Sequence, residues 1–168
     1  SLSPLIHNHW MKKYRLVDSV YEKRKVEEKD LENIIEKIRE GEIVGVNVTV
    51  PFKKLIIPFL DKLDSSAEET QSVNTLFKIS NKVVGYNTDK AGFLETIKKL
   101  YPKNKNSMMP LPLESKSILI LGAGGVTSSI ISALKAEGAN NITLSNRTRE
   151  KAKEIKKLFP EIEVVDWG

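Results

Sequence analysis

The chain has 168 residues, of which 40% are hydrophobic and 29% charged, with a formal net charge of +5 and no cysteine. These numbers are typical of one or two folded domains, and they exclude disulfides, thiolate catalysis and cysteine-based zinc sites. With two histidines in all, we expect no metal site. No apolar run reaches the roughly 18 residues of a membrane span, and no secretory signal opens the chain. We therefore expect a cytoplasmic protein without a membrane partner.

The first hundred residues mix helical and strand patterns. Helical spacing of apolar residues predicts helices over residues 4–13, 30–40, 52–63 and 88–100. Ser3 is a candidate N-cap of the first helix, Gly41 a C-cap of the second, and Pro58 a break in the third. Strands are predicted over residues 18–26, 43–50, 76–79 and 83–84, with a Ser80-Asn81 turn joining the last two. The β-branched run 43–50 indicates a strand buried on both faces of a parallel sheet.

Residues 101–116 differ in character, because they contain three prolines and no clear periodicity. This composition predicts an exposed linker between a domain over 1–100 and a second over 117–168. Strand and helix patterns then alternate strictly, which is typical of a parallel Rossmann-type sheet. The strands are expected over 117–121, 141–144 and 163–165, and the helices over 126–137 and 149–159.

A glycine-rich turn joins the first predicted strand of the second domain to its helix. Gly122 permits a tight turn, and Gly124 lets the backbone approach a pyrophosphate. The following helix N-terminus offers N–H groups to that anion. Thr127 stands where the third glycine of the G-x-G-x-x-G pattern would fall, and it is small enough to allow close helix–strand packing. The turn predicts a dinucleotide site, with a purely structural turn as the alternative.

The end of the next strand distinguishes between the two nicotinamide cofactors. NAD-binding enzymes usually carry Asp or Glu there to bind the ribose hydroxyls, whereas this strand ends in Ser145-Asn146-Arg147. The Arg147 guanidinium suits a 2′-phosphate, and Arg149 and Lys151 add positive charge. The pattern favours NADP, unless these cations merely open a solvated helix.

Polar residues stand in the first domain where structure alone does not require them. Asn47 and Thr49 interrupt an apolar strand, and Lys53 follows its terminal proline. The segments Asn74-Thr75 and Asn87-Thr88-Asp89 lie at the ends of predicted elements. Such a set suits a site that fixes a polar substrate and supplies a proton to a carbonyl.

Six segments, taken in order, resemble the shikimate dehydrogenase family: Ser1-Leu2-Ser3-Pro4, Asn47-Val48-Thr49-Val50-Pro51-Phe52-Lys53, Val73-Asn74-Thr75, Gly85-Tyr86-Asn87-Thr88-Asp89, Gly122-Ala123-Gly124-Gly125 and Asn146-Arg147-Thr148. The resemblance covers nearly the whole chain. It implies an α/β protein, with an N-terminal α/β substrate domain containing a mixed, mostly parallel sheet and an incomplete Rossmann-type NADP-binding domain. It also implies reversible, NADPH-dependent reduction of 3-dehydroshikimate to shikimate in aromatic amino acid (chorismate) biosynthesis, by a monomer or homodimer.

The resemblance also implies roles for individual residues. Lys53 would be the catalytic acid/base, and Asp89 would pair with it and bind substrate hydroxyls. Ser1 and Ser3 would bind the substrate carboxylate, while Asn74 and Thr49 would line the same pocket. The expected NADP contacts are Gly122, Ala123, Gly124, Gly125, Val126, Asn146, Arg147 and Thr148. Asn47 is expected to hold its loop together internally, and His7 to be a structural helix residue.

The chain departs from the family pattern in three places. Gln71-Ser72 stands where the family usually has Gly-Ala. Family members also begin with a strand ahead of the first motif and continue well beyond residue 168, so we expect this chain to be a fragment truncated at both ends. If the polypeptide itself ends at Gly168, we expect its dehydrogenase activity to be weak or absent. The rival interpretations are a quinate/shikimate dehydrogenase that also uses NAD, a non-catalytic NADP-binding module, and a nucleic-acid binder. The last is disfavoured because the lysines are not clustered.

Overall fold

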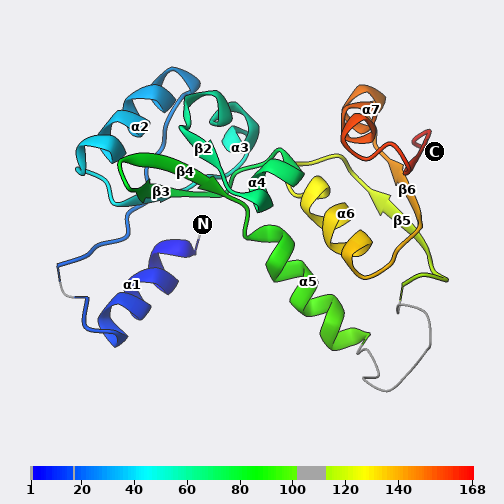
Figure 1. The fold of residues 1–168 in the computed structure, drawn as a ribbon, viewed down its shortest axis with the longest axis horizontal. Helices are drawn as coiled ribbons and strands as arrows, with labels where there is room; N and C mark the ends of the chain where they lie inside the picture. The colour runs from blue at the N-terminus through cyan, green and yellow to red at the C-terminus, as the bar shows by residue number, and fades with distance from the viewer. Residues whose placement is uncertain (1, 17, 102–112) are drawn as a thin grey trace. The chain divides into compact units, whose positions relative to one another are not determined.

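The computed structural model describes residues 2–16, 18–101 and 113–168, which form two compact units, 1–31 and 32–168. The first unit contains helix α1 (Ser3–Lys13) and the 3-10 helix η1 (Glu28–Asp30) (Figure 1). Leu2 occupies the N-cap of α1, so the expectation that Ser3 caps this helix is wrong, and Ser3 is its first residue.

No strand forms in the described part of residues 18–26, contrary to the prediction. The Asn8 amide donates to the Tyr21 carbonyl at 2.9 Å and accepts from the Tyr21 N–H at 2.8 Å. A side chain of α1 thus takes both backbone groups that a neighbouring strand would otherwise pair.

Helix α2 (Leu31–Glu40) leads into the second unit and buries Ile35 and Ile38 at helical spacing. Gly41 ends it with a φ of +87°, a conformation that glycine adopts without strain, as predicted for this C-cap.

A four-stranded sheet follows in the order β1-β3-β4-β2 (Figure 1). Strand β3 (Thr75–Ile79) pairs antiparallel with both β1 (Gly45–Asn47) and β4 (Lys82–Tyr86), and β2 (Lys62–Leu63) pairs parallel with β4. The sheet is therefore mixed, as expected, but its described ladders are mainly antiparallel. Ser80 and Asn81 join β3 to β4 with positive φ values of 45° and 65°, which confirms the predicted hairpin turn.

Strand β1 is shorter and more exposed than predicted for residues 43–50. It pairs with β3 alone among the described strands, and Val44 and Val50 beside it are 89% and 72% exposed. A β-branched run indicates strand propensity, but burial depends on what covers the strand. The expectation of a strand covered on both faces is wrong for the described residues.

The predicted helix over 52–63 is instead three short elements: α3 (Phe52–Leu55), the 3-10 helix η2 (Ile57–Phe59) and strand β2. Pro58 lies in the first turn of η2, where a proline is tolerated, and the helical run is broken in this region as predicted. Helix α4 (Ser65–Thr70) was not predicted. Asp64 caps it by accepting from the Ser66 N–H at 3.0 Å, and this hydrogen bond, followed by one from the Ser66 hydroxyl, lowers the pKa of the Asp64 carboxyl.

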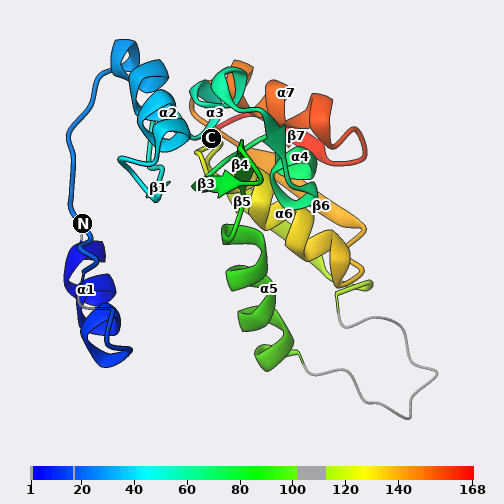
Figure 2. The same cartoon turned by 60° about the vertical axis from the view of Figure 1, so that its left-hand side comes forward.

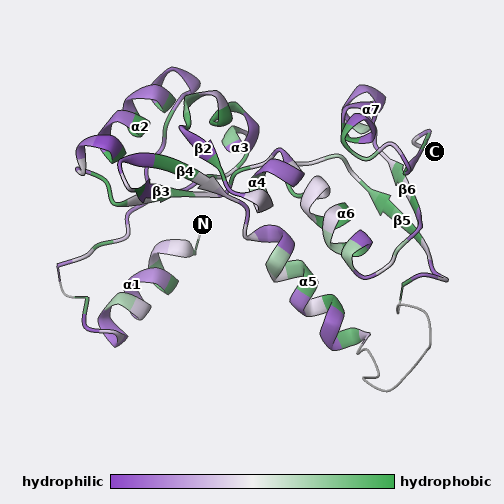
Figure 3. Cartoon of the chain, in the orientation of Figure 1, coloured by the Kyte–Doolittle hydropathy of each residue, from purple (hydrophilic) through white to green (hydrophobic). Residues whose placement is uncertain are grey.

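Helix α5 (Asp89–Leu100) packs against α6 (Thr127–Ala136), and the two lie side by side in Figures 1 and 2. Strands β5 (Ser117–Leu121), β6 (Asn141–Ser145) and β7 (Glu163–Val165) form the predicted parallel sheet, in that order. Helix α7 (Arg149–Leu158) connects β6 to β7. The apolar colouring of β5 and β6 in Figure 3 matches a core that includes Ile131, Ile142, Leu144, Ile155 and Ile162.

Candidate active site

Lys53 lies in the first turn of α3, directly after the Thr49–Pro51 turn. The Phe52 N–H donates to the Thr49 carbonyl at 2.9 Å, and the Lys53 carbonyl accepts from the Val73 N–H at 2.8 Å. The Lys53 ammonium reaches across to α5 and donates to Asp89 Oδ2 at 2.6 Å. The two side chains are 14% and 24% exposed, so they form a partly buried ion pair. The predicted pairing of Lys53 with Asp89 is confirmed.

Asn74 holds the second oxygen of the same carboxylate. Its Nδ2 donates to Asp89 Oδ1 at 2.9 Å, and its Oδ1 accepts from the Thr88 N–H at 3.0 Å. Both carboxylate oxygens of Asp89 therefore have a protein partner, one cationic and one neutral. An ammonium, a carboxylate and an amide from three separate segments meet at one point.

The other residues predicted in or near the substrate site have different surroundings in the structure. Thr49 is exposed in the turn before Lys53. Asn47 lies in β1 and donates to the Thr75 hydroxyl of β3 at 3.0 Å, so it has the expected structural role but connects two strands instead of holding its own loop. Ser1 lies outside the described residues, and Ser3 lies in the first unit, so both substrate roles stay predictions.

The glycine turn has the geometry that its sequence predicts. Gly122 has a φ of +110°, where a residue with a Cβ is strained. The Gly122 N–H donates to the Ser145 carbonyl at 2.8 Å, and the Thr127 hydroxyl donates to the Gly122 carbonyl at 3.0 Å. Among the described residues, no neighbouring atom lies within 4 Å of a Cβ built on Gly124, so open space adjoins the turn there. An anionic group has room to approach this backbone at the N-terminus of α6.

The glycine turn lies next to the Lys53–Asp89 pair. A Cβ built on Gly125 would be 3.6 Å from Lys53 Cδ and 3.5 Å from Val50 Cγ2. The Ser72 hydroxyl also donates to the Gly125 carbonyl at 3.2 Å. The segment before Asn74 is thereby tied to the turn, and the Lys53–Asp89 ion pair and the glycine turn lie side by side.

Both ends of the Asn146 side-chain amide have protein partners. Its Oδ1 accepts from the Ala123 N–H at 2.9 Å, and its Nδ2 donates to the Thr148 carbonyl at 2.7 Å. The Asn146 amide thus holds the glycine turn against the β6–α7 loop. Arg147 and Thr148 are exposed in that loop, while Arg149 forms an ion pair with Asp166. An open turn, a helix N-terminus and the exposed Arg147 guanidinium fit the phosphates of NADP.

The sequence interpretation missed Ser72 and Ser129 as contributors to this site. Ser72 was noted as a departure from the family pattern, whereas its hydroxyl binds the glycine turn. Ser129 belongs to a set of buried small polar residues on α6, with Ser128 and Ser132. Hydroxyls at helical spacing within an apolar helix are the signal that would have identified this surface.

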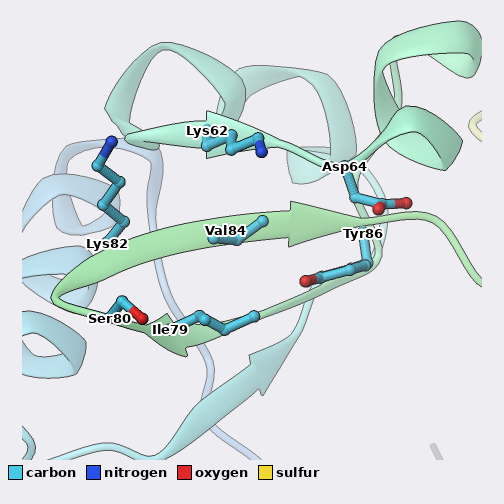
Figure 4. Close-up of a pocket in the computed structure, with 7 residues that line it drawn as sticks. All are labelled: Lys62, Asp64, Ile79, Ser80, Lys82, Val84 and Tyr86. Atoms are coloured by element: carbon cyan, nitrogen blue, oxygen red, sulfur yellow. The ribbon is translucent and has the colours of Figure 1, made fainter.

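A shallow pocket on the four-stranded sheet contains none of the predicted site residues (Figure 4). It is lined by Lys62, Asp64, Ile79, Ser80, Lys82, Val84 and Tyr86. Within residues 2–16, 18–101 and 113–168, no group of three or more metal-ligating side chains could hold a metal ion. None of the helices in this part of the chain has the length and hydropathy of a membrane span.

Comparison with known proteins gave matches along most of the chain. A family model described as the shikimate dehydrogenase substrate binding domain matches residues 1–76, and one described as shikimate / quinate 5-dehydrogenase matches residues 104–166. The shikimate dehydrogenase (NADP(+)) of Pelagibacter ubique is 51% identical over all 168 residues, which cover 60% of that protein.

Two solved structures illustrate the structural similarity. The shikimate dehydrogenase of Aquifex aeolicus gives a TM-score of 0.82 at 41% identity, covering 98% of this chain and 57% of that one. The enzyme of Thermus thermophilus, solved in complex with NADP(H) and shikimate, gives 0.78 at 28% identity, covering 98% and 58%. The chain thus spans a little over half the length of the relatives it matches.

Proposed function

Because this chain belongs to the shikimate dehydrogenase family, we propose that it catalyses the reversible, NADPH-dependent reduction of 3-dehydroshikimate to shikimate. The reaction would be a cytoplasmic step in aromatic amino acid biosynthesis. The observation that carries the proposal is the Lys53–Asp89 pair, 2.6 Å apart and with Lys53 next to the glycine turn. A proton donor beside an anion-binding backbone is what reduction of a carbonyl by a dinucleotide requires.

Lys53 is the proposed acid/base. Its ammonium would donate a proton to the alkoxide that develops on the substrate oxygen, and its amine would accept that proton in the reverse direction. The ion pair with Asp89 fixes the direction of the ammonium. When bound, NADPH supplies the hydride for the carbonyl carbon.

Asp89 and Asn74 are proposed to bind the substrate hydroxyls. The carboxylate accepts hydrogen bonds, whereas the amide both donates and accepts. Their mutual bond at 2.9 Å orients both groups toward one point. Thr49 would line the same pocket, and Ser1 and Ser3 would bind the substrate carboxylate. Such a site discriminates strongly, because a missing hydroxyl leaves polar groups unpaired.

The proposed cofactor site uses the backbone from Gly122 to Val126 for the pyrophosphate. Arg147 and Thr148 would hold the 2′-phosphate of NADP, and the Asn146 amide would keep the turn and this loop in register. Residues 1–100 would thus bind the substrate and residues 117–168 the dinucleotide, with 101–116 connecting them. Of this predicted linker, residues 102–112 lie outside the described part of the chain.

The test is a steady-state assay of the purified protein with 3-dehydroshikimate and NADPH, followed by loss of NADPH absorbance. We expect saturable turnover with both ligands and a marked preference for NADPH over NADH. The description of the matching family model also names quinate, so quinate and NAD are assayed in parallel in the oxidative direction. Equal rates with quinate and NAD would favour the broader enzyme. Tight NADP binding with no turnover would favour a binding module.

A further inference from the structure

Asn87 is the most heavily hydrogen-bonded buried side chain around the candidate site, and the proposed reaction gives it no role. Asn87 is 3% exposed and lies directly after β4, two positions before Asp89. Its backbone N–H donates to the Ser66 hydroxyl of α4 at 3.0 Å. Its side-chain amide is used on both sides, by groups from three different segments.

The amide oxygen of Asn87 binds the N-terminus of α5. Oδ1 accepts from the Asp89 N–H at 3.0 Å and from the Lys90 N–H at 3.2 Å. These are the first two N–H groups of the helix, which have no partner within it. Thr88, at the N-cap position, makes no side-chain cap, so Asn87 takes over that function.

The amide nitrogen fixes Asn87 itself. Nδ2 donates to the Ser72 carbonyl at 2.8 Å and to the Ser129 hydroxyl of α6 at 2.9 Å. Ser72 and Ser129 are fully buried. Since the Ser72 hydroxyl binds the Gly125 carbonyl, these contacts connect the first turn of α5 to the glycine turn and to α6.

The acceptor that binds the first N–H groups of α5 determines the direction in which the Asp89 carboxylate points. An aspartate in the first turn of a helix is attracted by the N–H groups and by the dipole there. Without another acceptor, its side chain would turn back onto its own helix. With Asn87 Oδ1 on those N–H groups, the carboxylate extends to Lys53 and Asn74 instead.

We propose that Asn87 is a positioning residue for the reaction: it caps α5 in place of Asp89 and so holds the Asp89 carboxylate on Lys53, in register with the glycine turn. The proposal rests on the proposed function, since it concerns the same acid/base pair. It adds a residue that acts through Asp89 without touching the substrate.

The test compares three alanine variants in the dehydroshikimate assay. Asn87→Ala removes both the cap and the tie to α6. Ser129→Ala removes the tie and keeps the cap. Ser132→Ala is the matched control, because Ser132 is also buried on α6 and bonds one side chain of α4, Glu69, at 2.6 Å. Each variant is assayed well below its Tm, with kcat, KM and the pH profile of kcat measured.

For Asn87→Ala we expect kcat to fall about tenfold or more, with a smaller change in KM for NADPH and a displaced pH profile of kcat. Ser129→Ala should lower kcat by about threefold, in the manner of one lost neutral hydrogen bond. Ser132→Ala should lower Tm and leave both kcat and the pH profile unchanged. A merely structural Asn87 would lower Tm in the same way as Ser132 and move neither kinetic quantity.

Two results would overturn the proposal. The first is Asn87→Ala with wild-type kcat and pH profile. The second applies if Asn87→Ala does not fold: Ser129→Ala then decides, and wild-type kinetics in that variant refute the positioning role. Absence of turnover in the wild-type protein would instead contradict the proposed function, so the two failures are separable.

Discussion

The candidate site has two halves: the Lys53–Asp89 ion pair is formed by side chains, whereas the glycine turn is formed by the backbone. At Lys53 and Asp89, side chains from separate segments hold one another through hydrogen bonds of 2.6 to 2.9 Å. At the glycine turn, the backbone determines the geometry: Gly122 has a φ of +110°, and the space beside Gly124 is open. The first half depends on which functional groups are present, and the second on which backbone conformations are allowed.

This difference indicates how a substitution should affect each half. A change of side chain at Lys53 would remove the proposed proton donor and leave the backbone intact. A change from Gly122 to alanine adds one methyl group at a φ of +110° and strains the backbone of the turn. Variants of Lys53 should therefore lower the reaction rate, whereas variants of Gly122 should lower the stability of the fold.

Lys53→Ala gives the largest expected effect. Removing a general acid/base typically costs about 10²- to 10⁴-fold in rate, so kcat for 3-dehydroshikimate should fall within that range. NADP binding, followed by fluorescence titration, should be preserved. Lys54→Ala is the matched control, since Lys54 is the exposed neighbour on the same helix. Comparable loss in both variants would show that the assay responds to α3 as a whole and not to the amine.

Gly122→Ala and Gly124→Ala separate folding from ligand approach within the second half. At Gly122 the positive φ makes alanine strained by on the order of 1–3 kcal/mol, and Tm should fall by several degrees. At Gly124 a methyl group meets no protein atom within 4 Å, so Tm should hold while NADP affinity falls. Thermal melts with and without NADP measure both quantities. Equal Tm values for the two variants would contradict the assigned roles.

Arg147→Ala tests the charge that favours NADP. A hydrogen bond to a charged group is worth about 1.5–3 kcal/mol, so the preference for NADPH over NADH in kcat/KM should drop by about tenfold or more. The KM for 3-dehydroshikimate should stay close to that of the wild type. Lys156→Ala, at an exposed position in the last turn of α7, is the control. An unchanged cofactor preference would remove Arg147 from the site.

Asp61→Asn gives the smallest effect and lies outside both halves. The Val83 N–H, at 2.7 Å, and the Arg39 guanidinium lower the pKa of the Asp61 carboxyl below 3.8. A lowered folded-state pKa contributes stability that is present above the unfolded pKa and is lost as pH falls through the folded value. The variant should lose on the order of 1 kcal/mol of unfolding free energy at pH 7 and less at acid pH. Denaturant melts from pH 7 to pH 3 measure this, and a pH-independent difference would refute it.

The parts predicted from the sequence are those that local patterns determine. The Ser80-Asn81 hairpin, the Gly41 helix end and the Gly122 turn each follow from residues adjacent in the chain. The alternation of strands and helices beyond residue 117 was predicted for the same reason. The pairing of Lys53 with Asp89, thirty-six positions apart, was implied by the family resemblance alone.

The errors have a common cause in contacts distant along the sequence. The run over 43–50 predicts a strand, yet its burial depends on what covers it, and Val44 is almost fully exposed. Residues 18–26 have strand-like spacing, but the Asn8 side chain takes the Tyr21 backbone groups. The capping role of Asn87 also escaped prediction, because it depends on Ser72 and Ser129, which come together in the fold alone.

The most direct test of the central claim is the single-turnover rate of NADPH oxidation at saturating 3-dehydroshikimate, in the wild type and in Asp89→Asn. Asparagine keeps the shape of the side chain but removes the charge that fixes the Lys53 ammonium. The account predicts unchanged NADPH affinity and a chemical step slowed by at least about tenfold. A wild-type rate in Asp89→Asn would contradict it, because the amine would then act without its carboxylate.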